Sequence, residues 1–147
     1  MMEGARRVCA SPYPFPAMSD NETAQVVLVV DDDASARRTA SEILRRSGYT
    51  VLQAAAGTEA LSVSWSHDGG IDLLLTDIVL PGMNGVQLAS RIADQRPGIS
   101  VVFMSGRPEV DAVRFGVLAP SYPFLPKPFG APELLEMVRA VLSVRAS

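Results

Sequence analysis

The sequence predicts an α/β fold in which a five-stranded parallel sheet is covered by helices on both faces. Apolar runs of strand length alternate five times with segments whose apolar residues recur at helical spacing. The first run, residues 26–30, is continuously apolar and β-branched, which is typical of a strand buried on both faces. Because parallel strands are joined by right-handed helical crossovers, such an alternation places helices on both sides of one sheet.

Strands and helices alternate along the whole chain after residue 25. We expect strands over residues 26–30, 49–55, 71–76, 99–105 and 122–125. We expect helices over residues 34–48, 57–70, 85–98, 108–116 and 131–144. The strand segments are short and apolar, whereas the helical segments repeat apolar residues every three or four positions.

The helix ends are marked by glycine and proline. Gly48, the glycine pair 69–70 and the Pro-Gly pair 97–98 are the expected stops of the first three helices. The fourth helix has a proline at its start and Gly116 at its end, so we expect it to be short or mobile. The inward positions of the first, third and last helices are Ala36, Ala40, Ile43, Leu44, Ser47, Leu88, Ala89, Ile92, Leu134, Val138, Val141 and Leu142.

Composition limits the kind of protein. A chain of 147 residues has room for one ordinary domain, which we expect over residues 25–147. The net charge of −3 does not favour nucleic acid as a partner, and no apolar run approaches the roughly 18 residues that span a bilayer. The single cysteine, Cys9, forms no internal disulfide, so we expect a reducing compartment, the cytoplasm.

The N-terminal segment differs from the rest. Residues 1–24 have three prolines within 11–16 and no apolar stretch typical of a secretory signal. We expect this segment to be a disordered tail. Met18 is a natural start for the chain, which makes residues 1–17 a candidate upstream extension.

Polar side chains follow four of the five predicted strands. They are Asp31, Asp32, Asp33, Asp77, Ser105 and Lys127. The carboxyl ends of parallel strands meet at one edge of the sheet, where ligands bind, so we expect these residues to form one site. Asp33 is also the expected N-cap of the first helix, and for Asp31 and Asp32 alone a capping or helix-dipole role is the competing interpretation. The competing interpretation of Asp77 is an acid that starts a turn.

Four motifs at these positions carry a family resemblance. They are VLVVDDD at 27–33, LLLTDIVLPGMNG at 73–85, VVFMSG at 101–106 and FLPKPF at 124–129. In this order and spacing they resemble the receiver domain of two-component response regulators, over residues 26–142. The resemblance implies a doubly wound, flavodoxin-like sheet of order 2-1-3-4-5 with five helices.

The resemblance implies a phosphoacceptor and a metal site. Asp77 matches the aspartate that takes a phosphoryl group from a phosphohistidine. Clustered carboxylates need a cation, and hard oxygen ligands suit Mg²⁺. By resemblance, Asp32 and Asp77 contact the metal directly, Asp31 acts through water, and the backbone carbonyl of Val79 adds a ligand.

The resemblance also implies the groups that stabilise and read the phosphoryl group. The Lys127 ammonium and the Ser105 hydroxyl would pair with its oxygens. A cis bond before Pro128 would aim the lysine at the acids. Ser105 and Phe124 would form the switch, with the hydroxyl moving toward the phosphoryl group and the ring turning inward; a simple core position is the alternative for Phe124.

We therefore expect a single-domain response regulator, a phosphoacceptor rather than an enzyme proper, that promotes its own phosphorylation and dephosphorylation. Its expected partners are a sensor histidine kinase or phosphotransfer protein and a downstream protein target, with no nucleic acid and no membrane; a homodimer is left open. Because the chain ends at Ser147 soon after the last helix, we expect no DNA-binding output domain.

Three other functions compete with this one. A receiver fragment of a hybrid histidine kinase and a receiver-like binding module that works without phosphorylation remain alternatives. An aspartyl phosphatase is disfavoured because valine, not an acid, stands at position 79. His67, the single histidine, is expected at the surface with no phosphorelay role.

Overall fold

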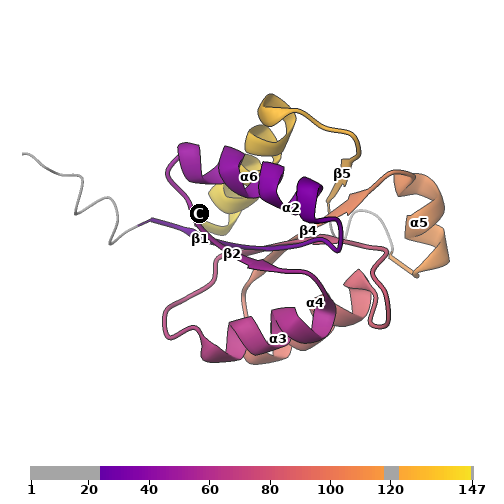
Figure 1. Cartoon of the computed structure of the whole chain (residues 1–147), viewed down its shortest axis with the longest axis horizontal. Coiled ribbons are helices and arrows are strands. Elements are labelled where there is room, and N and C mark those ends of the chain that lie inside the picture. The colour runs from indigo at the N-terminus through magenta and orange to yellow at the C-terminus, as the bar shows by residue number, and fades with distance from the viewer. Residues whose placement is uncertain (1–23, 118–122, 147) are drawn as a thin grey trace, which may run out of the picture.

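Five parallel strands form one sheet in the order β2-β1-β3-β4-β5 in the computed structural model, which describes residues 24–117 and 123–146. The strands are β1 (Val26–Val30), β2 (Thr50–Ala54), β3 (Leu73–Asp77), β4 (Ser100–Ser105) and β5 (Phe124–Pro126). The helices are α2 (Ala34–Arg46), α3 (Gly57–Ser66), α4 (Gly85–Gln95), α5 (Pro108–Arg114) and α6 (Ala131–Ala146). The predicted doubly wound α/β fold, with its strand order, is confirmed (Figure 1).

Helices cover both faces of the sheet. Helices α2 and α6 lie together on one face, and α3 and α4 lie on the other, with α5 beside β4 and β5 (Figure 1). Side chains of one strand alternate between the faces: Val27 and Val29 pack toward α2 and α6, whereas Leu28 and Val30 pack toward α3 and α4. Both faces of the sheet are therefore shielded from water, which explains why the strand residues are apolar on both faces.

Most predicted inward positions lie in these two cores. Leu88, Ala89 and Ile92 of α4 are buried, as are Leu134, Val138 and Leu142 of α6. In α2, Ala40 and Leu44 are buried, while Ser47 is exposed because it is the C-cap residue. Gly48 follows with a φ of 99°, in the left-handed region that glycine adopts easily, so the predicted stop of this helix is confirmed.

Helix α3 ends earlier than the sequence predicts. It stops at Ser66 and not at the glycine pair 69–70. The cause is the side chain of Arg96, which follows α4 and donates hydrogen bonds to the carbonyl oxygens of Ser64, His67 and Gly69 at 2.7–2.8 Å. A guanidinium from a distant part of the chain thus satisfies carbonyls at the helix end, a contact that local sequence signals do not reveal.

The fourth helical segment is short, as predicted. Helix α5 has seven residues and begins at Pro108. Strand β5 covers residues 124–126, so it begins after residue 123 and ends one residue later than the predicted strand 122–125, whose first residue lies outside the described residues. Predictions that concern residues 1–23, 118–122 and 147 lie outside the described residues; these include nearly all of the tail 1–24, the extension 1–17 and Cys9. Within the described part of the chain, no helix is both long enough and apolar enough to cross a bilayer.

The start of α4 lies against the end of β3. The Gly85 N–H donates to the Ile78 carbonyl oxygen at 2.9 Å. A Cβ atom on Gly85 would lie 2.5 Å from the Asp77 carbonyl oxygen and 2.8 Å from the Ile78 Cα. Because those neighbours are backbone atoms, they cannot rotate away. Gly85 therefore lets the chain turn back directly beneath the residue that ends β3.

We expect Gly85→Ala to lower the free energy of unfolding by about 3 kcal/mol, because the added methyl group overlaps backbone that must move. Urea unfolding followed by circular dichroism measures the change. Gly70→Ala is the matched control, since nothing lies within 4 Å of a Cβ there, and it should change stability by less than about 0.5 kcal/mol. Equal effects of the two substitutions would contradict the steric explanation.

Candidate functional site

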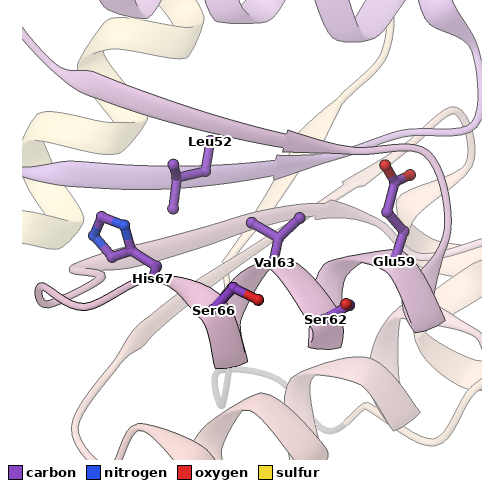
Figure 2. A pocket seen from close by; sticks show the side chains of 6 residues that line it. All are labelled: Leu52, Glu59, Ser62, Val63, Ser66 and His67. Atoms are coloured by element: carbon purple, nitrogen blue, oxygen red, sulfur yellow. The ribbon is translucent and has the colours of Figure 1, made fainter.

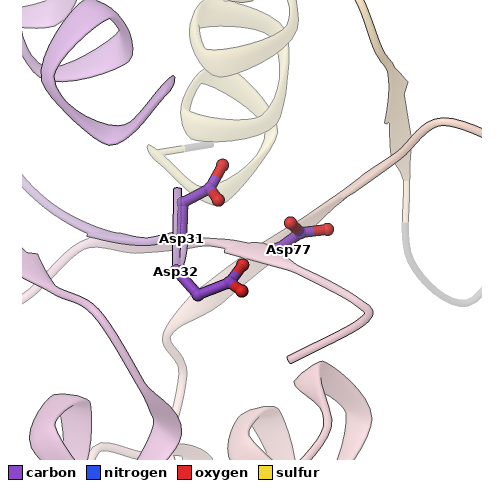
Figure 3. A group of neighbouring side chains, drawn as sticks. All are labelled: Asp31, Asp32 and Asp77. Carbon is purple, nitrogen blue, oxygen red and sulfur yellow. The ribbon is translucent and has the colours of Figure 1, made fainter. Parts of the chain in front are cut away.

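Three carboxylates meet where β1 and β3 end. The two strands are neighbours, and Val30 of β1 lies opposite Thr76 of β3, so the residues that follow them are brought side by side. Each of Asp31, Asp32 and Asp77 has a carboxylate oxygen within 4.8 Å of one from each of the others. Figure 3 shows the three side chains around one space at this edge of the sheet. Asp31 is buried, Asp77 is half-buried and Asp32 is exposed.

Lys127 reaches the same space from the end of β5, the edge strand beyond β4. Pro126 of β5 lies opposite Ser105 of β4, and the Lys127 N–H donates to the Ser105 carbonyl oxygen at 2.8 Å. Its Nζ donates to Asp31 Oδ2 at 2.9 Å and to Asp77 Oδ2 at 3.0 Å. The Lys127–Pro128 peptide bond is cis, the geometry that the family resemblance implies. One ammonium therefore joins residues from three different strand ends.

Asp31 is held from several directions. Its Oδ1 accepts the Asp33 N–H at 2.9 Å while its Oδ2 accepts Lys127, and its backbone carbonyl accepts Arg37 Nη1 at 2.7 Å. Asp33 also caps α2, as predicted, by accepting the N–H groups of Ser35 and Ala36. Arg37 was not identified from the sequence; it lies one turn into α2 among exposed polar residues, where no local pattern distinguishes it.

The charges at this site are unbalanced. Burial raises the pKa of the Asp77 carboxyl, the Lys127 ammonium opposes the rise through a hydrogen bond and its charge, and the neighbouring Asp31 adds to it. Burial lowers the pKa of Lys127, but the hydrogen bonds to Asp31 and Asp77 outweigh burial and raise it overall. A single ammonium thus stays charged between acids whose mutual repulsion it offsets only in part.

The donor set fits a hard divalent cation. Within the described residues no hydrogen bond or ion pair engages the Asp32 carboxylate, although it lies within 4.8 Å of the other two. Three carboxylates with one ammonium leave negative charge that a divalent ion would neutralise, and oxygen ligands suit Mg²⁺. The Val79 N–H donates a hydrogen bond to the Asp77 carboxylate, which places the expected fourth ligand residue next to the cluster.

Ser105 ends β4, and Phe124 begins the neighbouring strand β5. The Ser105 hydroxyl donates to Asp111 Oδ2 at 2.5 Å and accepts the Arg107 N–H at 2.9 Å. No hydrogen bond among the described residues joins it to Asp77 or to the Lys127 side chain. The Phe124 ring is half-buried and packs on Phe103, with centroids 5.6 Å apart. Sequence reasoning missed Asp111, which looks like one more acid in a polar helix.

A hollow in the surface lies away from the carboxylates. It runs between β2 and α3 and is lined by Leu52, Glu59, Ser62, Val63, Ser66 and His67. Figure 2 shows His67 at one end of it, close to the turn that follows α3. These side chains do not form a group suited to one ligand or one reaction, so the hollow carries no functional proposal.

We expect Asp77→Asn to stabilise the metal-free protein at pH 7. Because the folded state raises the pKa of Asp77, the charged carboxylate is disfavoured there, and an uncharged amide of similar shape removes that cost. The difference between variant and wild type should shrink as the pH falls through the folded-state pKa toward the ordinary value of 3.8, since the wild-type carboxyl then becomes neutral.

Urea unfolding in the presence of a chelator, repeated between pH 4 and pH 8, measures this difference. Asp68→Asn, a substitution of an exposed acid after α3, is the control for a general effect of net charge. A variant that is less stable than wild type at pH 7 would mean that the Lys127 ion pair outweighs burial.

Comparison with known proteins agrees with this geometry. Residues 27–139 match the family model of the response regulator receiver domain. The chain is 33% identical over 135 residues to the sensor kinase CckA of Brucella abortus, covering 92% of this chain and 14% of that protein. It is 32% identical over 121 residues to the transcriptional regulator NtrC of Azospirillum brasilense, covering 82% and 25%. The chain thus spans a quarter or less of these relatives.

Solved structures give the same result. The receiver domain of the hybrid histidine kinase CckA superposes with a TM-score of 0.68 at 34% identity, covering 80% of this chain and 98% of that one. The chemotaxis protein CheY4 of Vibrio cholerae superposes with a TM-score of 0.69 at 26% identity, covering 81% and 99%. With the family match over most of the chain, these likenesses show that the protein belongs to the response regulator receiver family of two-component signalling.

Proposed function

We propose that the protein is a phosphorylation-dependent switch whose phosphoacceptor is Asp77. The observation that carries this proposal is the placement of the Lys127 ammonium, 2.9 Å from Asp31 and 3.0 Å from Asp77, at the edge of three clustered acids. A nucleophilic carboxylate with a fixed ammonium and a cation site beside it is suited to phosphoryl transfer, in which the protein mainly positions groups and neutralises charge.

In the proposed reaction, an Asp77 carboxylate oxygen attacks the phosphorus of a phosphohistidine on the donor protein. The P–O bond to Asp77 forms as the P–N bond breaks, and the imidazole leaves with the electron pair and takes up a proton. Lys127 keeps its hydrogen bond to Asp31 and pairs with a phosphoryl oxygen in place of Asp77. Asp32, Asp77 and the Val79 carbonyl would hold Mg²⁺ directly, with Asp31 acting through water, and the bound ion would supply charge that neutralises the phosphoryl oxygens.

The buried position of Asp31 fits a supporting role. Both of its carboxylate oxygens are already bonded, to the Asp33 N–H and to Lys127. We propose that Asp31 anchors the lysine and would act on a bound cation through water, while the exposed Asp32 would ligate it directly. We further propose that the chain is a phosphoacceptor that promotes its own phosphorylation and dephosphorylation, as receiver domains generally do.

The proposed donor is a sensor histidine kinase or a phosphotransfer protein, and the proposed output is contact with a downstream protein. The switch would run through Ser105 and Phe124, on adjacent strands beside α5. We propose residues 25–147 as the receiver and a stand-alone response regulator as its context. A receiver portion of a hybrid kinase is the second candidate, favoured by the likeness to the kinase CckA. The cytoplasm remains the proposed compartment.

Incubation with acetyl phosphate and Mg²⁺ should add one phosphoryl group to the protein, seen as an acid-stable, base-labile gain in intact mass. Asp77→Asn should show no gain, and a chelator should abolish it in wild type. Glu59→Gln, a substitution of a carboxylate that lies on α3 and bonds the Ala55 N–H, is a control that should be modified normally. Identical behaviour of wild type and Asp77→Asn would favour a binding module that works without phosphorylation.

We expect Asp32→Asn to weaken Mg²⁺ binding by roughly tenfold or more, because it replaces a charged ligand that has no other partner among the described residues. Calorimetric titration with Mg²⁺ measures the affinity. Asp33→Asn keeps a capping side chain outside the cluster and should bind Mg²⁺ within about twofold of wild type. If both substitutions weaken binding equally, the acids act only through net charge.

A further inference from the structure

Helix α5 contributes a buried acid to the side of β4. Asp111 is 3% exposed, and Ser105, its hydrogen-bond donor, is 1% exposed. The Ser105 hydroxyl donates to Asp111 Oδ2 at 2.5 Å, and the other oxygen, Oδ1, is buried with no hydrogen-bond partner among the described residues. Within the described residues no cation forms a salt bridge with this carboxylate. Asp111 therefore depends on one hydroxyl.

The hydrogen bond from Ser105 to Asp111 is strong because its acceptor is a buried carboxylate. A hydroxyl bonded to a buried carboxylate is worth more than a neutral hydrogen bond, and a buried acid stripped of its donor carries the full cost of its desolvation. The Arg107 N–H, which donates to the Ser105 oxygen at 2.9 Å, holds the same rotamer from the other side. The hydroxyl is thus fixed toward α5 by two neighbours.

The same hydroxyl has only one proton to donate. Under the proposed function, a phosphoryl group on Asp77 recruits Ser105, so Asp111 and the phosphoryl oxygen compete for that proton. The backbone of Ser105 cannot shift to serve both acceptors, because it lies in β4 with its carbonyl oxygen bonded to the Lys127 N–H at 2.8 Å. Only rotation of the side chain remains, and this rotation breaks the bond to Asp111.

Breaking that bond leaves Asp111 buried with both oxygens unpaired. The cost is relieved when α5 moves outward and lets water reach the carboxylate. Helix α5 is suited to such movement: it has seven residues, and Val110 and Val113 on it are exposed at 51% and 84%. Few of its apolar side chains therefore hold it against the sheet.

We propose that Asp111 is a positioning residue that holds the Ser105 hydroxyl away from the phosphoryl site and couples its release to displacement of α5. This inference rests on the proposed function, since it needs a phosphoryl group at Asp77. Asp111 is then the charged group that links phosphorylation of Asp77 to a change at the surface of α5 that carries Val110 and Val113.

The test uses the full chain and beryllium fluoride with Mg²⁺, a non-covalent substitute for a phosphoryl group on a carboxylate. Calorimetry gives its affinity for wild type, Asp111→Ala, Ser105→Ala and the double variant. We expect Asp111→Ala to bind about tenfold more tightly than wild type, because Ser105 no longer gives up a charge-assisted hydrogen bond. In the Ser105→Ala background the same substitution should change the affinity by less than about twofold.

Two further variants separate the alternatives. Asp111→Asn keeps the shape of the side chain and removes its charge, so it should bind beryllium fluoride several-fold more tightly than wild type. It replaces Asp111→Ala in the test if that variant does not fold. Glu109→Ala removes an exposed acid from the same helix and should leave the affinity unchanged. A purely structural role for Asp111 would change the affinity equally with and without the Ser105 hydroxyl, and this result would overturn the proposal.

Amide hydrogen exchange over residues 108–114 gives an independent measurement. In wild type, beryllium fluoride should speed exchange in this segment. In Ser105→Ala, exchange should already be fast without the ligand, because Asp111 has lost its donor. Unchanged exchange in both proteins would overturn the coupling. If wild type and Asp77→Asn bind beryllium fluoride equally, the proposed function fails, and this inference fails with it; if only wild type binds, the Asp111 results decide the inference alone.

Discussion

The site depends on one ammonium group that bonds two carboxylates at once. Lys127 follows β5, Asp31 follows β1 and Asp77 ends β3, so this contact ties three strand ends together. Asp77 and Asp31 lie 50 and 96 residues from the lysine in sequence. The contact forms only if the registers of all the intervening strand pairs are correct, because a slip of one residue would turn each side chain to the opposite face. The two apolar cores are what fix those registers.

The same contact leaves the site with too little positive charge. Three carboxylates face one ammonium, and the half-buried Asp77 is disfavoured in its charged form despite its bond to Lys127. This imbalance favours the binding of a divalent cation, which would supply the positive charge that an incoming phosphoryl group needs. The crowding of acids at the carboxyl edge of the sheet is thus also the source of the proposed reactivity.

Much of the fold and of the acid cluster was predictable because it is recorded in local patterns. Continuous apolar strands, helical spacing and the position of Asp31, Asp77 and Lys127 after their strands require no knowledge of distant contacts. What could not be predicted depends on side chains that reach across the structure. Arg96 shortens α3 from beyond α4, and Asp111 is buried only because α5 turns it toward Ser105. Both look like ordinary surface charges in the sequence.

Carbon-13 NMR of the Asp77 carboxyl group, followed with pH in metal-free protein, tests the central electrostatic claim most directly. We expect a pKa above the ordinary value of 3.8 in wild type, because burial disfavours the charge. In Lys127→Met the pKa should rise further, because the opposing ammonium is gone. A pKa at or below the ordinary value in wild type would mean that the Lys127 ammonium outweighs burial and would contradict the charge imbalance. The same pKa in both proteins would show that Lys127 does not hold the acids as the structure indicates.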